Sequence, residues 1–139
     1  MIVRPAQPED TLPIVMVWQA AFAEKCKPDH ILRKIKDKEF IFAVAEHNGT
    51  VIGFADVKTS LNPAKFNLYT IAAHPIDAPH GTGQALLKWV EQMSHMAGAT
   101  CLNLAVRAFN KRGIMFYEKA GYTAYEVRPA GSSYRKELP

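Results

Sequence analysis

Two glycines in a short polar segment are the residues of this chain best suited to bind phosphate. Gly81 and Gly83 stand in residues 78–84, directly before an apolar segment with helical spacing. The first amides of a helix have no intrahelical acceptor and attract anions, and a glycine has no Cβ to hold a phosphate at a distance. The segment therefore predicts backbone binding of a phosphate or pyrophosphate, although Gly-Thr-Gly alone also fits an ordinary turn.

The spacing around these glycines argues against two other nucleotide-binding classes. A Walker A loop requires the pattern GxxxxGK[ST], which this segment does not have. A dinucleotide-binding fingerprint requires a third glycine where this chain has Leu86, and the segment here follows strands that are predicted to be antiparallel. Nucleotide hydrolysis and hydride transfer are therefore disfavoured.

Asn110 and Tyr117 are the second place where the sequence offers chemistry. They are seven residues apart, or two helical turns, so both side chains lie on one face of a helix predicted over residues 110–120. The phenol of a tyrosine is protonated at neutral pH and is suitable as a proton donor. An N-cap role for Asn110 and a core role for Tyr117 fit the same pattern.

Hydrophobic alternation predicts the sheet that must position these residues. Strands are expected at residues 2–5, 40–45, 51–57, 67–73, 101–106 and 122–127, with a weak final strand at 132–136. Pro5 places the first strand at a sheet edge, because proline removes a ladder donor. Asn48 and Gly49 form a tight hairpin turn between the second and third strands, and a break at 60–63 precedes the fourth. The second, third and fourth strands therefore form an antiparallel run.

Four helices are expected around this sheet. Two begin at Asp10, which is expected to be an N-cap, and at Asp29, and the other two cover residues 83–97 and 110–120. The third helix has its apolar residues on one face, as in a helix that packs on a sheet. It connects the fourth and fifth predicted strands as a crossover, so these two strands are expected to be parallel.

Composition fits one ordinary globular domain. The chain has 139 residues, of which 48% are hydrophobic and 22% charged, and this favours a single domain over residues 1–139. The net charge of +4 is too small to distinguish nucleic acid, a membrane surface and a phosphate-rich ligand. Cys26 and Cys101 form neither a disulfide framework nor a zinc motif, and no apolar segment is long enough to span a bilayer. A cytoplasmic location is the expectation.

In order and spacing, these segments resemble the GCN5-related N-acetyltransferase (GNAT) superfamily. The family pattern is a strand ending in V-x-P, then [RQ]-x-x-G-x-[GA] and an apolar helix; here residues 73–75 read Ala-His-Pro and residues 78–83 read Ala-Pro-His-Gly-Thr-Gly. Residues 110–122 are similar to the family's N-x-x-A-x-x-x-Y-x-x-x-G-[FY]. The chain departs from these patterns at Ala78, where arginine or glutamine is usual, and at Gly113, where alanine is usual.

The resemblance implies the fold and the activity of that superfamily. The fold is α/β (α+β), with a central mixed, mostly antiparallel and twisted sheet of six or seven strands, a splayed parallel pair and about four flanking helices. The activity is transfer of an acetyl group from acetyl-coenzyme A to a primary amine of a small molecule or peptide, by direct attack in a ternary complex and without a metal. We expect neither nucleic acid nor a membrane as a partner.

The resemblance also assigns roles to individual residues. The cofactor-binding set comprises strand residues for the pantetheine arm, turn amides for the pyrophosphate and one helix residue: Ile71, Ala72, Ala73, His80, Gly81, Thr82, Gly83, Gln84 and Asn110. Tyr117 would give a proton to the departing thiolate. Many relatives have a glutamate base on the strand before the turn, but residues 67–73 contain no acid. Asp56, Glu46 and His74 are substitutes among which the sequence does not choose.

Other functions stay open on the sequence alone. Ala78 and the missing strand acid are compatible with a non-catalytic sensor or interaction module that binds an acyl-coenzyme A on the same fold. The basic balance fits a small nucleic-acid-binding domain. Trp18, Phe22, His30 and Tyr69 are candidates for an acceptor pocket, and core packing explains them as well. The acceptor and the oligomeric state, a homodimer included, are not fixed by the sequence.

Overall fold

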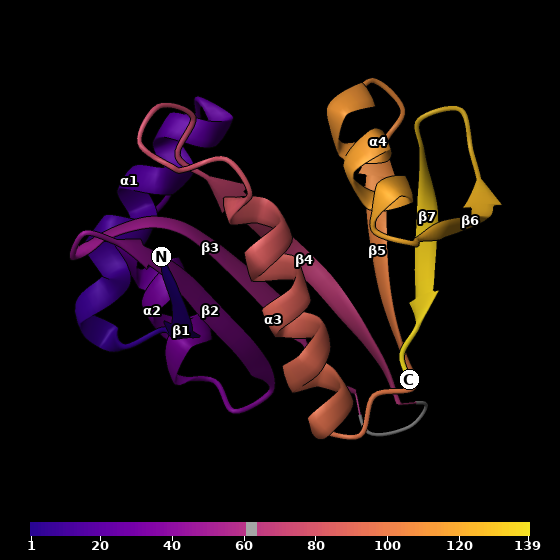
Figure 1. The fold of residues 1–139 in the computed structure, drawn as a ribbon, viewed down its shortest axis with the longest axis horizontal. Helices are drawn as coiled ribbons and strands as arrows, with labels where there is room; N and C mark the ends of the chain where they lie inside the picture. The colour runs from indigo at the N-terminus through magenta and orange to yellow at the C-terminus, as the bar shows by residue number, and fades with distance from the viewer. Residues whose placement is uncertain (61–63) are drawn as a thin grey trace.

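Seven strands form a single sheet, and α-helices cover it (Figure 1). The computed structural model describes residues 1–60 and 64–139, within which the strand order is β1-β2-β3-β4-β5-β7-β6. The strands are β1 (Ile2–Pro5), β2 (Phe40–His47), β3 (Thr50–Lys58), β4 (Lys65–Ala73), β5 (Cys101–Arg107), β6 (Thr123–Val127) and β7 (Gly131–Glu137). The helices are the short 3-10 helix η1 (Pro8–Asp10) and the α-helices α1 (Thr11–Phe22), α2 (Pro28–Lys36), α3 (Thr82–Met96) and α4 (Lys111–Lys119). These strands are antiparallel to their neighbours except for β4 and β5, so the predicted mixed sheet is confirmed.

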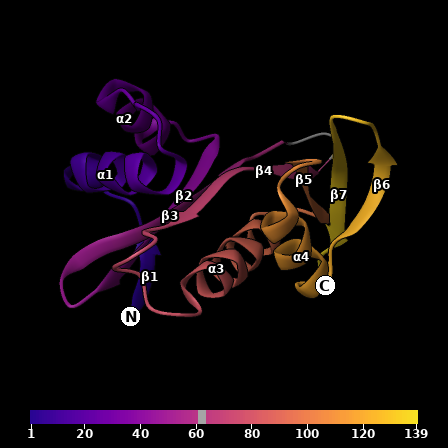
Figure 2. The same ribbon diagram turned by 90° about the horizontal axis from the view of Figure 1, so that it is seen from above.

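The helices lie on both faces of the sheet, and each face has its own core. α1 and α2 pack against β2, β3 and β4 on one face, and α3 packs on the other face beside α4, as Figure 2 shows. The first core includes Ile14 and Phe54, and the second includes Leu86 and Leu102. Inward side chains on alternate strand positions fill both cores. Within the described residues, no helix has the length and apolar character that a membrane span requires.

The β2–β3 hairpin turns where the sequence predicts. Asn48 and Gly49 have positive φ angles of 52° and 77°, and His47 pairs with Thr50 across the turn. Glycine reaches this region without strain, and asparagine tolerates it better than most residues. The predicted break at 60–63 falls outside the described residues except for its first position.

The parallel strands β4 and β5 are paired at one end and diverge at the other. Three residue pairs join them, and the last is Asn67 with Asn103. Beyond that pair the two strands separate, as Figure 1 shows between the magenta β4 and the orange β5. A bulge bends β4 just past this point, because Tyr69 is an extra residue between the partners of Asp56 and Val57. The sheet is therefore splayed at the carboxyl ends of both strands.

The predicted capping role of Asp10 is wrong. Its side chain makes no capping hydrogen bond to α1. The carboxylate instead accepts from the guanidinium of Arg4 at 2.8 and 3.0 Å and from the amide of Gln7 at 2.7 Å. Arg4 thereby holds the pKa of Asp10 below its usual value. The cause is η1, because it gives Asp10 a helical backbone and joins α1 directly.

The strand predicted as weak at 132–136 is longer than expected and lies inside the sheet. As β7 it pairs with β5 along seven positions, from Cys101 with Glu137 to Arg107 with Gly131. β6 pairs only with β7 and forms the sheet edge. Only Tyr134 among the residues of β7 is buried, and most of the others are polar. The hydrophobic alternation that predicts a strand is therefore weak in this segment.

Candidate functional site

A cleft of about 680 Å³ lies where β4 leads into α3. Eight of the residues predicted from the sequence line it together: Ile71, Ala72, Ala73, His80, Gly81, Thr82, Gly83 and Gln84. The first three belong to the end of β4, and the other five belong to the turn before α3 and to its first residues. The structure therefore brings the predicted strand and turn residues to one cleft.

A smaller cavity of about 240 Å³ adjoins the cleft on the side of α4. Asn110 and Tyr117, the remaining predicted residues, line it. The two cavities share Gly83, Arg112, Phe116 and the last three residues of β4. All the predicted site residues thus border one continuous region at the splayed end of β4.

The turn before α3 presents unpaired backbone amides. In the part of the chain that the structure describes, the N–H groups of His80, Gly81, Gly83 and Gln84 have no hydrogen-bond acceptor. The amide of Thr82 differs from the others, because it donates to the carbonyl of Pro79 at 3.2 Å. Four N–H groups at a helix start can bind an anion such as a pyrophosphate.

The two glycines keep the space beside these amides open. Gly81 has a φ of 94°, and a Cβ built on it meets nothing within 4 Å. A Cβ on Gly83 would lie 3.3 Å from two ring carbons of Phe116. A side chain at Gly81 would therefore project into open space beside the turn, and one at Gly83 would press on the wall of the smaller cavity.

Tyr117 has the environment of a protonated phenol. Burial raises its pKa to about 12, so the hydroxyl keeps its proton at neutral pH. The ring packs edge-on against Phe116 and Tyr122, with ring centroids 5.2 and 5.8 Å away. Among the hydrogen bonds of the described residues, none involves the Tyr117 hydroxyl, whereas Tyr122 donates to Glu91 at 2.7 Å. Tyr117 therefore offers a free donor where it borders the cavity.

Asn110 caps α4, as the sequence predicts. Its Oδ1 accepts from the amide of Gly113 at 2.9 Å, which leaves the amide nitrogen of its side chain as a donor. A Cβ on Gly113 would lie 2.5 Å from that nitrogen. Glycine at 113 costs helix propensity, and it also leaves room for the Asn110 side chain in its capping position.

The three candidate bases do not meet beside Tyr117. Asp56 is 1% exposed and pairs with a lysine, and burial raises the pKa of its carboxyl group. Glu46 accepts from Arg4 at 2.8 Å in the β1–β2 region. His74 lines the larger cleft, but its Nδ1 accepts from two backbone amides of the following turn, at 3.1 and 3.2 Å. Geometry favours none of them as a base.

Of the four aromatic side chains proposed for an acceptor pocket, three lie together and Tyr69 lies apart. Trp18 packs against Phe22 and His30, with ring centroids 5.1 and 6.4 Å away, on the α1 and α2 side of the sheet. Tyr69 lies against Phe40, 5.7 Å between centroids, and is 57% exposed. Only Tyr69 lines the cavity described next.

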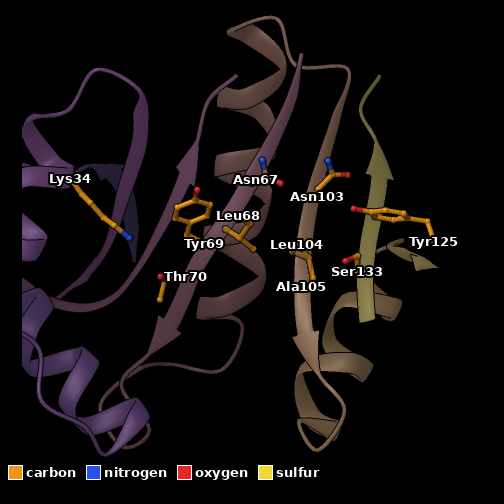
Figure 3. A pocket seen from close by; sticks show the side chains of 10 residues that line it. All are labelled: Lys34, Asn67, Leu68, Tyr69, Thr70, Asn103, Leu104, Ala105, Tyr125 and Ser133. Atoms are coloured by element: carbon orange, nitrogen blue, oxygen red, sulfur yellow. The ribbon is translucent and has the colours of Figure 1, made fainter. Parts of the chain in front are cut away.

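A third cavity, of about 420 Å³, lies on the opposite face of the sheet and has no counterpart in the sequence analysis. Figure 3 shows its side chains in front of the strands, with the helices α3 and α4 behind. Its polar lining residues come from five elements: Lys34, Asn67, Tyr69, Thr70, Asn103, Tyr125 and Ser133. One signal could have found it, because Asn67 and Asn103 each lie between two apolar residues of their strands and pair with each other.

The lining residues of the cavities on the two faces are adjacent along β4. Thr70 lines the cavity of Figure 3, and the next residue, Ile71, lines the two cavities on the other face. At this level β4 no longer pairs with β5 among the described residues. The end of β4 therefore borders cavities on both faces of the sheet.

Comparison with known proteins agrees with this geometry. The sequence model of the acetyltransferase (GNAT) family matches residues 10–122. An acetyltransferase of Yersinia pestis (strain Pestoides F) is 29% identical over 130 residues, which cover 91% of each chain.

Two solved structures share the fold. One is the PaiA N-acetyltransferase of Thermoplasma acidophilum in complex with coenzyme A, with a TM-score of 0.85, 21% identity and 98% of each chain covered. The other is the ribosomal-protein-S18-alanine N-acetyltransferase of Escherichia coli, with a TM-score of 0.84, 20% identity and coverage of 99% of this chain and 93% of that one. The family match spans most of the sequence, and the fold agrees with it. The chain therefore belongs to the acetyltransferase (GNAT) family and is a GNAT-type N-acetyltransferase.

Proposed function

We propose that this chain, as a single domain over residues 1–139, transfers an acetyl group from acetyl-coenzyme A to a primary amine of a small molecule or peptide by direct attack in a ternary complex. The observation that carries the proposal is the meeting of four unpaired amides and the Tyr117 hydroxyl on adjoining cavities. Acetyl-coenzyme A, when bound, supplies the acetyl thioester that the amine attacks.

The turn before α3 fits the pyrophosphate of this cosubstrate. The amides of His80, Gly81, Gly83 and Gln84 have no other acceptor among the described residues, and they stand at the positive end of the α3 dipole. Arg112 lines the same cleft and adds a positive charge. The coenzyme A complex of the Thermoplasma acidophilum relative supports the same ligand class.

The end of β4 fits the pantetheine arm. Past Asn67 the side of β4 that faces β5 has no strand partner among the described residues, so its backbone groups are available to a ligand that adds along the edge. Ile71, Ala72 and Ala73 border both the larger cleft and the smaller cavity. An amide at Ala72 or Ala73 would stabilise the negative charge that develops on the acetyl oxygen.

Tyr117 is the proposed proton donor to the leaving thiolate. Burial raises its pKa to about 12, far above neutral pH, so the phenol is protonated throughout the neutral range. The free hydroxyl borders the cavity that the β4 residues share. Asn110, at the start of α4, would contact the cosubstrate through its side-chain amide nitrogen.

The attacking amine must first lose a proton. For a lysine-like amine with a pKa near 10.4, this costs about 4.6 kcal/mol at pH 7. No carboxylate is among the described residues that line the cavities of Tyr117 and the turn. We therefore assign the deprotonation to no particular side chain.

The test is thiol release from acetyl-coenzyme A across a panel of amines, compared between Tyr117→Phe and Tyr122→Phe. Tyr117→Phe should lower kcat by about 100-fold or more with little change in coenzyme A affinity. Tyr122→Phe is the matched control, because this ring lies beside Tyr117 but its hydroxyl is bound to Glu91. Equal effects of the two substitutions would reject Tyr117 as the acid. Tight coenzyme A binding without turnover of any amine would favour an acyl-coenzyme A sensor.

A further inference from the structure

The cavity of Figure 3 shares no lining residue with the proposed cosubstrate-binding set. It lies on the face of the sheet away from α3 and α4, and it reaches the splay at Thr70. Under the proposed function, the acceptor amine attacks from this side while the thioester lies in the gap beside Ile71. Its volume of about 420 Å³ suits a small molecule.

The charged side chain that lines this cavity is positive. Lys34 is its one charged lining residue, and its other polar lining groups are amides and hydroxyls. No aspartate or glutamate lines it among the residues that the structure describes. A cavity that must hold a polycationic acceptor needs carboxylates to balance the charge, and this one has none.

Lys34 is held in place at the cavity wall. Its Nζ lies 2.8 Å from Oδ2 of Asp56, and the exposed fractions of the two side chains are 15% and 1%. The same Nζ lies 5.2 and 5.3 Å from the ring centroids of Phe40 and Tyr69. An ammonium group has three N–H donors, and Asp56 takes one of them. The exposed part of Lys34 can therefore donate to a ligand in the cavity while Asp56 fixes its position.

Asn103 adds an oriented donor to the same cavity. Its Oδ1 accepts from Nε of Arg135 at 2.9 Å, so its NH₂ group is the part left for a ligand. Arg135 stacks on Tyr125, 4.2 Å from the ring centroid, and brings a second positive charge behind the lining. The cavity thus combines a fixed ammonium group, an amide donor and a nearby guanidinium.

We propose that the acceptor is a small amine that also carries a carboxylate, as an amino acid does, and that Lys34 and Asn103 bind this carboxylate. The inference rests on the proposed function and names its substrate class. A carboxylate gains charge-assisted hydrogen bonds from these donors. A polyamine or an aminoglycoside would instead place further ammonium groups beside Lys34, where like charges repel.

The test compares each α-amino acid with its own α-carboxamide, alongside a polyamine and an aminoglycoside, at saturating acetyl-coenzyme A. The kcat/KM of the carboxylate should exceed that of its amide by about 10-fold or more, because a hydrogen bond to a charged group is lost in the amide. The double variant Lys34→Met with Asp56→Asn removes both charges together, so no lone charge stays buried, and it should bring this ratio close to one. Lys58→Met is the matched control, because Lys58 lies over the ring of Phe40 but does not line the cavity.

A second readout separates this inference from the proposed function. Binding of an N-acetylated amino acid in the presence of coenzyme A, followed by NMR, should occur in the wild type and in Lys58→Met and be lost in the double variant, with coenzyme A affinity retained in all three. Acetylation of amides or polyamines at least as fast as of carboxylates would overturn the inference and leave the proposed function standing. Carboxylate binding at Lys34 without acetylation of any amine would overturn the proposed function alone.

Discussion

The two faces of the splayed sheet are built for binding in different ways. On the face of α3 and α4, the proposed binding groups are backbone amides of one turn, residues 80–84, next to three residues of β4. On the opposite face they are side chains that arrive from five separate elements. The first surface is encoded in adjacent positions of the chain, whereas the second exists only after the sheet has paired in register.

This difference has a physical consequence for tolerance to mutation. Only a substitution by proline removes a backbone N–H, so the first face is sensitive mainly to changes in backbone conformation and in local space. A side-chain site is sensitive to each of its members, and a buried charge pair such as Lys34 with Asp56 is sensitive to the loss of either partner. The predictions below probe these sensitivities in order of expected size.

Breaking the buried pair should have the largest effect on stability. Lys34→Met should lower the free energy of unfolding by about 3–5 kcal/mol at neutral pH, because it leaves the Asp56 carboxylate buried without its partner. Urea unfolding followed by circular dichroism measures this. The control is Lys58→Met, which loses an exposed pair with Glu39 and should cost less than about 1 kcal/mol. Equal stability of the two variants would show that the pair of Lys34 and Asp56 does not stabilise the folded chain.

The stability of Lys34→Met should depend on pH through the carboxyl group of Asp56. Burial raises the pKa of Asp56, and Lys34 opposes that shift, so removing Lys34 raises the pKa further. A carboxyl group with a raised pKa in the folded state binds its proton more tightly when folded, so stability is highest below the unfolded pKa and falls as pH rises toward the folded pKa. The deficit of Lys34→Met relative to the wild type should therefore shrink as the pH is lowered from 8 toward about 4. A deficit that is independent of pH would exclude Asp56 as its source.

Disturbing the backbone site should have the next largest effect, this time on affinity. Gly81→Val places a β-branched side chain at a φ of 94° and in the open space beside the turn. Coenzyme A affinity, measured by calorimetry, should fall by about 100-fold or more, because the side chain blocks the approach to the amides. Gly98→Val is the matched control, because Gly98 has a φ of 100°, equally open surroundings and a place at the other end of α3. Both variants should lose stability through backbone strain, but only Gly81→Val should lose affinity.

The proposed proton donor, Tyr117, should affect the pH dependence of the rate at alkaline pH. A phenol with a pKa of about 12 remains almost fully protonated at pH 10, whereas an ordinary tyrosine is about half ionised there. The kcat/KM for acetyl-coenzyme A should therefore show no alkaline decline from Tyr117 below about pH 11. A decline centred near pH 10 that is absent in Tyr117→Phe would show that burial does not raise the pKa of Tyr117.

Restoring the family's usual residue at position 78 should have the smallest effect. Ala78 lines the cleft, and Ala78→Gln adds one polar side chain beside the amides proposed to bind the pyrophosphate. Coenzyme A affinity should change by less than about 10-fold. A gain of 100-fold would mean that side chains, and not the backbone, dominate binding on this face as well.

The sequence predicts elements and local sites better than it predicts contacts between distant segments. The hairpin at Asn48-Gly49, the parallel pair and the Asn110 cap are confirmed because each depends on short-range chemistry or on chain connectivity. Asp10 was misjudged because η1 gives it a helical backbone and because Arg4, six residues earlier, binds its carboxylate, and neither is visible in a capping pattern. Whether the residues that line the clefts bind the cosubstrate stays a prediction.

The cavity of Figure 3 could not be predicted from the sequence. Lys34, Asn103 and Tyr125 are far apart in the chain, and no motif relates them. They meet because α2 packs on one half of the sheet while β5, β7 and β6 form the other half. Their proximity depends on strand register and on the divergence of β4 and β5, neither of which a periodic pattern encodes.

The short pairing of β4 with β5 leaves the middle of the sheet incomplete. Three residue pairs connect the half that contains β1 to β4 with the half that contains β5 to β7, and they are all at one end. A ligand that fills the open end would act as a removable strand and link the halves along their length. Resistance to heat and to proteolysis should then rise with ligand concentration, so the cellular lifetime of the protein would follow the supply of the molecule it consumes.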